Sequence, residues 1–192
     1  IKKKDKTAFY NQVTILFNYI NKIVNVKIFN NGKIQMTGLK NTDACVEILE
    51  ILRKKIVESK ILSNLDNIVV TSSEIVLINS DCKMGYKINP DILYRIILNE
   101  GIFVTYEPCI YPGVNIKYYI KGNEELCGKC NCNNLCNGKG KNGDCKKVTI
   151  AVFNSGNIII TGARKTEQLL ECYHFITNTI NKNRSELEQK SE

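Results

Sequence analysis

The chain has 192 residues, of which 43% are hydrophobic, and it carries a formal net charge of +8 with a pI near 9.0. This length and apolar content exclude a disordered chain and predict a globular protein of one or two domains. The basic charge favours a polyanionic partner, nucleic acid before an anionic membrane, with a solvated basic surface as an equal alternative. No apolar run approaches the ~18 residues of a spanning helix and no signal-peptide core is present, so we expect a soluble, intracellular protein.

The N-terminal part of the chain predicts a small sheet followed by one helix. Alternating apolar residues indicate strands at 13–19 and 24–29, and the NNG turn followed by 33–37 completes a β-hairpin. A helix is expected after Thr-Gly, with Thr42 as a suitable N-cap and apolar residues at helical spacing thereafter.

The second part of the chain repeats this order after an additional segment at 68–106. In this segment the pattern predicts a strand at 68–79, a helix at 90–99 and a short strand at 102–106. Strands at 114–120, 148–153 and 157–161 then precede a helix that Thr166 is suited to cap. The last residues, 185–192, are expected to form a charged, solvated tail.

Residues 28–56 are repeated at 152–180 with a constant offset of 124 residues. The identical pairs are Phe29/Phe153, Asn30/Asn154, Gly32/Gly156, Ile34/Ile158, Thr37/Thr161, Gly38/Gly162, Thr42/Thr166, Glu47/Glu171 and Ile56/Ile180. Two copies are too few for a solenoid, which needs about three, so one pseudo-twofold domain with a shared surface is predicted. Tyr10 and Tyr111 match at an offset of only 101, which indicates an insertion of 23 residues at about 122–147.

Five of the nine cysteines lie in this insertion: Cys127, Cys130, Cys132, Cys136 and Cys145. Four of the five would suffice for a structural, tetrahedral Zn²⁺ site. Reduced thiols on a loop and local disulfides are the alternatives. The other four cysteines are scattered, which argues against a secreted disulfide framework and for a reducing compartment. At about 3.3 Å per strand residue, the loop is expected roughly 20 Å from Phe153, as a partner-binding or stabilising element.

The aligned copies resemble the core domain of the TATA-box-binding protein family. The motifs are the duplicated hairpin-helix element with its Phe, Gly and Thr-Gly residues, YEPCIYPGVNIKYYI at 106–120 and DNIVV at 66–70. The resemblance covers about 7–182 apart from the insertion. It implies an α+β fold in which two repeats form a curved antiparallel saddle, with helices on the convex face and DNA under the concave face.

On this alignment, residues 1–62 form the first repeat without its N-terminal strand and helix, and 63–184 form the second repeat with the insertion. The absent front half indicates an N-terminal truncation or a lopsided fold. Abundant Lys, Ile and Asn, whose codons are A/T-rich, indicate an A/T-rich genome. With the resemblance, the expected source is a divergent eukaryotic or large-DNA-virus lineage. The resemblance then implies a nucleus or a viral replication compartment.

Family members bind the minor groove and wedge pairs of Phe side chains between base steps at both ends of an A/T-rich site. The resemblance assigns these wedges to Phe29 and Phe153, with Tyr10 and Tyr111 at the positions of the second Phe. Polar groups on the groove floor match Thr37, Thr161 and Asn67. Basic phosphate contacts match Lys33, Lys40, Lys117 and Arg164, whereas Asn157 replaces a family lysine.

Strand alternation also places Lys27, Gln35 and Asn115 on the concave surface, where the family has mainly aliphatic residues. We therefore expect a more hydrated concave surface, and these polar residues argue against strict specificity for TATA sites. The loop residues Glu107, Cys109 and Ile110 match the family's docking site for a TFIIB-like factor, although only Glu107 keeps the family's residue type.

The leading hypothesis is a TATA-box-binding-like transcription initiation factor that binds and bends A/T-rich DNA, with a TFIIB-like partner and no membrane or small-molecule ligand. The alternative is a protein-interaction module of the same fold within a transcription complex, with little or no DNA binding. A regulatory domain of a nucleic-acid enzyme is a third interpretation. No paired carboxylates and no phosphate-binding loop are apparent, and His174 lies in an ordinary helix pattern, so no enzyme is expected.

Overall fold

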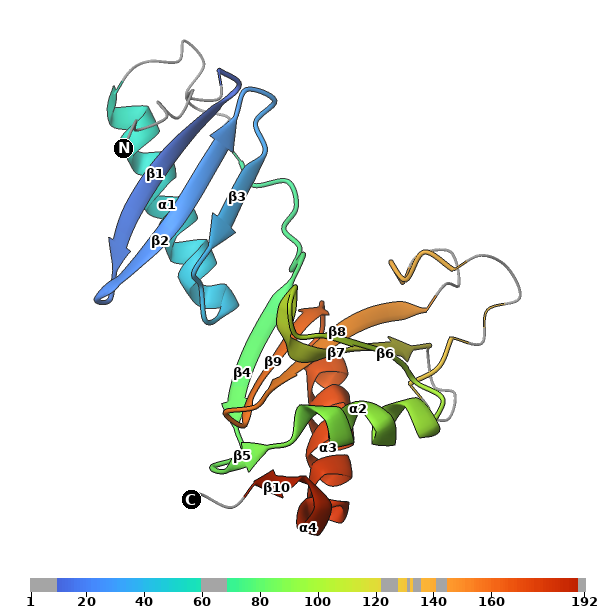
Figure 1. Cartoon of the computed structure of the whole chain (residues 1–192). Coiled ribbons are helices and arrows are strands. Elements are labelled where there is room, and N and C mark those ends of the chain that lie inside the picture. The colour runs from blue at the N-terminus through green and yellow to red at the C-terminus, as the bar shows by residue number, and fades with distance from the viewer. Residues whose placement is uncertain are drawn as a thin grey trace. The chain divides into compact units, whose positions relative to one another are not determined.

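The computed structural model describes residues 10–59, 69–121, 128–130, 132, 136–140 and 145–189. The chain forms two compact units, Ile1–Ser72 and Ser73–Glu192 (Figure 1). Each unit combines antiparallel strands with helices, so the predicted α+β class is confirmed. No helix in these described ranges is long and apolar enough to cross a membrane.

The first unit is a three-stranded antiparallel sheet backed by one helix. Its elements are β1 (Gln12–Tyr19), β2 (Lys22–Phe29), β3 (Ile34–Thr37) and α1 (Thr42–Ser59), with sheet order β1-β2-β3. Alternation directs one set of strand residues toward α1, and the buried core consists of Val24, Val26, Ile48 and Leu52. The predicted hairpin and the strand before it are therefore confirmed.

The second unit is a five-stranded antiparallel sheet with the order β4-β9-β8-β7-β6. Its strands are β4 (Ile78–Lys83), β6 (Phe103–Glu107), β7 (Tyr111–Ile120), β8 (Lys146–Phe153) and β9 (Asn157–Ala163). The long helices α2 (Pro90–Asn99) and α3 (Thr166–Lys182) pack against one face of this sheet (Figure 1). Strand residues such as Val114, Ile116 and Ile150 are fully buried against apolar residues of both helices.

Two local predictions were wrong. The strand expected at 68–79 lies at Ile78–Lys83, because pairing with β9 selects this polar stretch over the more apolar residues before it. The helices begin at Thr42 and Thr166, so neither threonine is the N-cap. Asn41 Oδ1 instead accepts a hydrogen bond from the Ala44 amide at 3.0 Å.

The chain end also differs from the expected tail. Residues 184–189 form a short helix, α4 (Arg184–Leu187), and a strand, β10 (Glu188–Gln189), that pairs with β5 (Lys87–Ile88). Leu187 is fully buried in the core of the second unit, and its carbonyl accepts a hydrogen bond from the Asn89 amide at 2.8 Å. Burial of Leu187 holds this largely charged segment against the core of the second unit.

Candidate nucleic-acid interface

The face of each sheet that points away from its helices carries polar and exposed side chains; we call it the open face. In the second unit it consists of odd-numbered strand residues: those at 79–83 in β4, 103–105 in β6, 111–119 in β7, 147–153 in β8 and 157–161 in β9. In the first unit it comprises 12–18 (even) of β1, 23–29 (odd) of β2, and 35 and 37 of β3. These assignments follow from strand alternation and the register of pairing.

The second unit brings its two predicted wedge residues together. The rings of Tyr111 and Phe153 meet edge to face, with centroids 5.7 Å apart. Gly113 is paired directly with Phe153, and a Cβ on it would lie 3.0 Å from Tyr111 Cε1 and 3.1 Å from Phe153 Cε1. The absent side chain of Gly113 is therefore what lets the two rings touch.

The first unit places Phe29 at the equivalent position, paired with Gln12. Tyr10 does not join it in the structure, where Tyr10 is fully exposed. Gln12 occupies the place of Gly113, and its Cβ fills the space in which the rings of the second unit meet. The structure thus forms one of the two predicted aromatic pairs.

One row of paired residues crosses the whole open face of the second unit, and it is polar except for Phe103 at the β6 edge. Pairing aligns Phe103, Lys117, Thr149, Thr161 and Asn79 from one edge strand to the other. The first unit has a shorter equivalent row, in which Asn25 is paired with both Leu16 and Thr37. Thr37 and Thr161 therefore hold matching positions, as the duplication predicted.

Asn79 is a candidate that sequence reasoning missed. It lies on β4 directly opposite Thr161, with an exposed side chain on the open face. The predicted floor residue Asn67 lies outside the described residues. The only signal in the sequence was the polar character of INSDCK, which is weak because edge strands of this kind do not show a clear apolar alternation.

Two asparagines of the open face have carbonyl oxygens without a hydrogen-bond partner among the described residues. These are Asn25 Oδ1 in the first unit and Asn115 Oδ1 in the second, and both atoms are buried. Lys27 and Gln35, which are paired with each other, add further polar groups. The predicted polar open face is confirmed, and its unsatisfied oxygens favour a ligand or water that donates hydrogen bonds.

Two pairs of basic residues stand at equivalent positions of the repeats. Lys22 lies beside Lys40, and the close approach of this second ammonium group is the main reason that the pKa of Lys22 is lowered. Lys146 lies near Arg164, and its pKa is lowered first by burial and then by the positive charges of Arg164 and Lys147. Lys40 and Arg164 were predicted phosphate contacts, whereas their neighbours Lys22 and Lys146 were missed.

The remaining predicted basic residues lie on or beside the open faces. The ammonium of Lys117 donates a hydrogen bond to Thr149 Oγ1 at 3.1 Å, and burial, followed by repulsion from Lys147, lowers its pKa. Lys33 is exposed at the end of the first hairpin. Its counterpart Asn157 is paired with Lys83, so β4 restores a positive charge at the site where the second repeat lost one. Asp81, paired with Ile159, places a negative charge on the same face.

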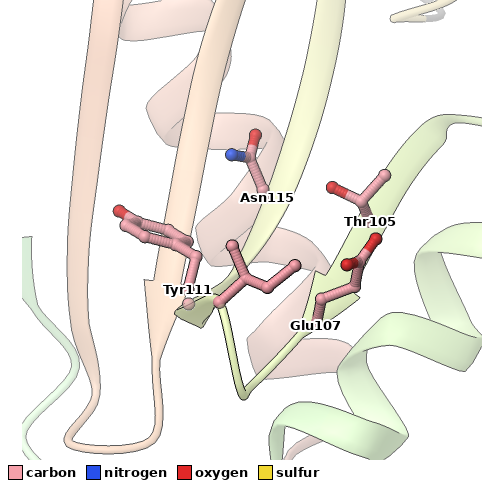
Figure 2. A pocket seen from close by; sticks show the side chains of 6 residues that line it. Thr105, Glu107, Tyr111 and Asn115 are labelled. Atoms are coloured by element: carbon pink, nitrogen blue, oxygen red, sulfur yellow. The ribbon is translucent and has the colours of Figure 1, made fainter.

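A shallow hollow of about 150 Å³ lies where the predicted partner loop meets the open face (Figure 2). It is lined by Thr105, Glu107, Ile110, Tyr111, Gly113 and Asn115. Figure 2 shows Tyr111 and Asn115 on one side of the hollow and Thr105 and Glu107 on the other. Ile110 is 80% exposed and Cys109 is also exposed, so the residues of the predicted loop are accessible.

Four of the five clustered cysteines converge. Cys130, Cys132, Cys136 and Cys145 place their sulfur atoms within 4.8 Å of one another, whereas Cys127 lies outside the described residues. Backbone hydrogen bonding from Cys145 is the main cause that lowers the pKa of Cys132, while burial raises that of Cys136. The cluster lies beside Tyr119, at the end of β7 opposite Tyr111.

Comparison with known proteins identifies relatives that share this sequence pattern. The sequence profile described as "Transcription factor TFIID (or TATA-binding protein, TBP)" matches residues 72–183. A "TATA-box-binding protein-like" protein of Acanthamoeba polyphaga mimivirus is 32% identical over 200 residues, which cover 94% of this chain and 50% of the relative. "TATA-box-binding protein 2" of Haloferax volcanii is 30% identical over 141 residues, covering 73% of this chain and 59% of the relative.

The fold agrees with these sequence relationships. The solved structure of "Methanococcus jannaschii TBP" superposes with a TM-score of 0.60 at 20% identity, covering 90% of this chain and 79% of that one. The chain spans only about half the length of the mimivirus relative. The profile match over more than half of the chain, together with these relatives, shows that the chain belongs to the TATA-binding protein family.

Proposed function

We propose that this protein is a transcription initiation factor that binds A/T-rich duplex DNA through the minor groove and bends it, without catalysing a reaction. The observation that carries the proposal is the equivalence of the two open faces. Phe29 and Phe153 hold the same register position in the two units, as do Thr37 and Thr161. We take the two units to be the two repeats of the family, each reading one half of a roughly symmetric site.

The aromatic residues supply the wedges in this proposal. Phe153 and Tyr111 form one wedge pair, in which flat rings cover the base faces that are exposed when a step is unstacked. Phe29 and Tyr10 form the other, and the full exposure of Tyr10 leaves its ring accessible to DNA. Deformable pyrimidine–purine steps in A/T-rich DNA lower the cost of both kinks.

Polar groups then read the groove floor. Thr37, Thr161 and Asn79 offer small donors to the acceptors that A·T and T·A pairs share in the minor groove. The oxygens of Asn25 and Asn115 are buried and unsatisfied in the structure, and on turning toward the open face they would accept from bridging waters or the amino group of guanine. We therefore expect a preference for A/T that is broader than a strict TATA site.

Affinity would come mainly from the basic residues. The Lys22–Lys40 and Lys146–Arg164 pairs bring two positive charges close together in each repeat. A phosphate bound at such a pair would offset the repulsion between the two charges. Lys33 and Lys83 add equivalent charges near the hairpin ends, and Lys117 contributes from the open face. Contacts of this kind position the duplex and make binding sensitive to salt.

The partner surface is proposed on the loop between β6 and β7. Glu107, Cys109 and Ile110 are exposed there, which supports docking of a TFIIB-like general transcription factor. Cys109 and Ile110 stand where the family has an acidic residue and a leucine. We therefore expect a partner factor that has diverged together with this surface. The mimivirus relative supports a large-DNA-virus lineage, with action in a viral replication compartment or a nucleus.

The test is to replace both wedge phenylalanines, Phe29→Ala with Phe153→Ala, and to measure bending of a doubly labelled A/T-rich duplex by energy transfer. We expect the bend to be lost while salt-sensitive binding persists in weakened form. Tyr173→Ala is the matched control, because Tyr173 is an exposed aromatic residue on α3, away from the open face. Unchanged bending by the double variant would reject the wedge role.

One observation favours the alternative function, a protein-interaction module with little DNA binding. Asp81 and the polar pair Lys27–Gln35 lie on the open faces, where a minor-groove ligand needs close contact. The alternative predicts no duplex binding by the wild-type chain even at low salt, together with a stable protein partner.

A further inference from the structure

We propose that Cys130, Cys132, Cys136 and Cys145 form a structural zinc site that fastens the insertion to the ends of β7 and β8. The inference is independent of DNA binding, because it rests on a cluster outside the wedge and floor residues. It commits to these four ligands and does not include Cys127, which lies outside the described residues.

The sulfur geometry fits a tetrahedral metal. The Cys132 and Cys145 sulfurs lie 3.3 Å apart, those of Cys130 and Cys145 lie 3.9 Å apart, and all four lie within 4.8 Å of one another. A tetrahedral Zn²⁺ with Zn–S bonds of about 2.3 Å requires S···S separations of about 3.8 Å. Small movements of the side chains would therefore complete the coordination sphere.

The backbone next to the cluster forms an ordered turn at residues 137–139. Gly138 lies within this turn and has φ +68°, a conformation that L side chains rarely adopt; the Lys139 amide donates a 2.8 Å hydrogen bond to Asn137 Oδ1 across it. This turn follows Cys136 directly, and Cys136 lies within 4.8 Å of the other three sulfur atoms.

The cluster also sits where a metal would join separate segments. Residues 138–140 run antiparallel to 145–147, with hydrogen bonds from Gly140 N to Cys145 O (3.0 Å) and from Lys147 N to Gly138 O (2.8 Å). Gly128 O accepts from the Tyr119 amide at 2.9 Å, which attaches the preceding segment to β7. Cys145 is fully buried at the start of β8. Zinc bound to all four thiolates would hold Cys130, Cys132 and Cys136 next to this strand.

Metal content tests the ligand set directly. The wild-type chain, purified under reducing conditions without chelator, should contain about one zinc per chain. Single Ser substitutions of Cys130, Cys132, Cys136 and Cys145 should each lower bound metal at least tenfold, whereas Cys127→Ser and Cys45→Ser should retain it. Less than a tenth of an equivalent in the reduced wild-type chain, or loss of metal in Cys127→Ser, would overturn the proposal.

Two further measurements cover variants that fold poorly. Cobalt added to the metal-free wild-type chain should give the absorption of a tetrahedral thiolate site, and zinc should displace it. Chelation should then speed hydrogen exchange of the Lys147 and Tyr119 amides, whose acceptors lie in the insertion, but not that of the Ile150 amide in the centre of β8. Two disulfides found by mass mapping of the reduced-purified protein, or exchange that chelation leaves unchanged, would reject the site or its fastening role.

Discussion

Tyr111 and Phe153 meet edge to face across the open face of the second unit, with ring planes inclined by 63°. The contact exists because Gly113, the residue opposite Phe153, has no side chain to separate the rings. In the first unit Gln12 takes that place opposite Phe29. The two ends of the proposed DNA site are thus chemically alike but not equally preorganised.

Replacing Gly113 by Ala should weaken DNA bending with little effect on folding. The new Cβ would lie about 3 Å from both rings and would force them apart. An aromatic pair contributes about 0.5–1.5 kcal/mol, so duplex affinity should fall roughly two- to tenfold and the bend measured by energy transfer should decrease. Gln12→Ala, which keeps a Cβ at the equivalent position, should leave bending unchanged. An equal loss in both variants would contradict a special role for the ring contact.

The duplication made the repeated elements predictable. Phe29 and Phe153 share a register because the flanking hydrophobic alternation is the same in both copies, and alternation fixes which face a residue occupies. The helix at 90–99 was equally clear, since Asn89 caps it and Pro90 occupies its first turn. Strong local patterns determine these elements before tertiary contacts are considered.

Residues whose position depends on distant pairing were not predictable. Asn79 and Lys83 reach the open face only because β4 pairs with β9, which lies about 80 residues further along the chain. The apolar stretch before Ile78 has the stronger strand pattern, so the sequence predicts a strand at 68–79 and not at Ile78–Lys83. Similarly, the spacing of the cysteines does not say that Cys130, Cys132, Cys136 and Cys145 converge, because this depends on the fold-back of 138–140 onto β8.

Asn79→Ala should reduce the discrimination between A/T-rich and G/C-rich duplexes. Asn79 lies opposite Thr161 in the row that crosses the open face, and its amide is the largest polar group at that end of the row. Loss of one base-edge contact costs about 1 kcal/mol, or roughly fivefold in the ratio of affinities, by competition binding. Asn178→Ala, on the exposed side of α3, is the control. A uniform loss on both duplexes would indicate a phosphate contact instead.

Cys172 should make the protein less stable at alkaline pH. Burial, followed by repulsion from Glu171, raises the pKa of this thiol from 9.0 to about 12 in the folded state. Between these values the unfolded chain releases a proton that the folded chain keeps, so the free energy of unfolding falls as pH rises from about 9 toward 12. Cys172→Ala should be less stable at neutral pH, by about 1–2 kcal/mol, but should show a shallower alkaline decline in denaturant titrations. An unchanged slope would show that other groups dominate.

Asp81→Asn should strengthen DNA binding. The carboxylate lies on the open face between Asn79 and Lys83, where it opposes the approach of a phosphate backbone. Exposed charges of this kind act over about one Debye length, so the gain should be roughly two- to fivefold at low salt and should shrink as salt is added. Asp91→Asn, at the exposed first turn of α2, changes the net charge equally but away from this face. Equal gains in the two variants would trace the effect to net charge. Weaker binding by Asp81→Asn alone would instead make the carboxylate an acceptor for a donor on the ligand and favour a protein partner on this face.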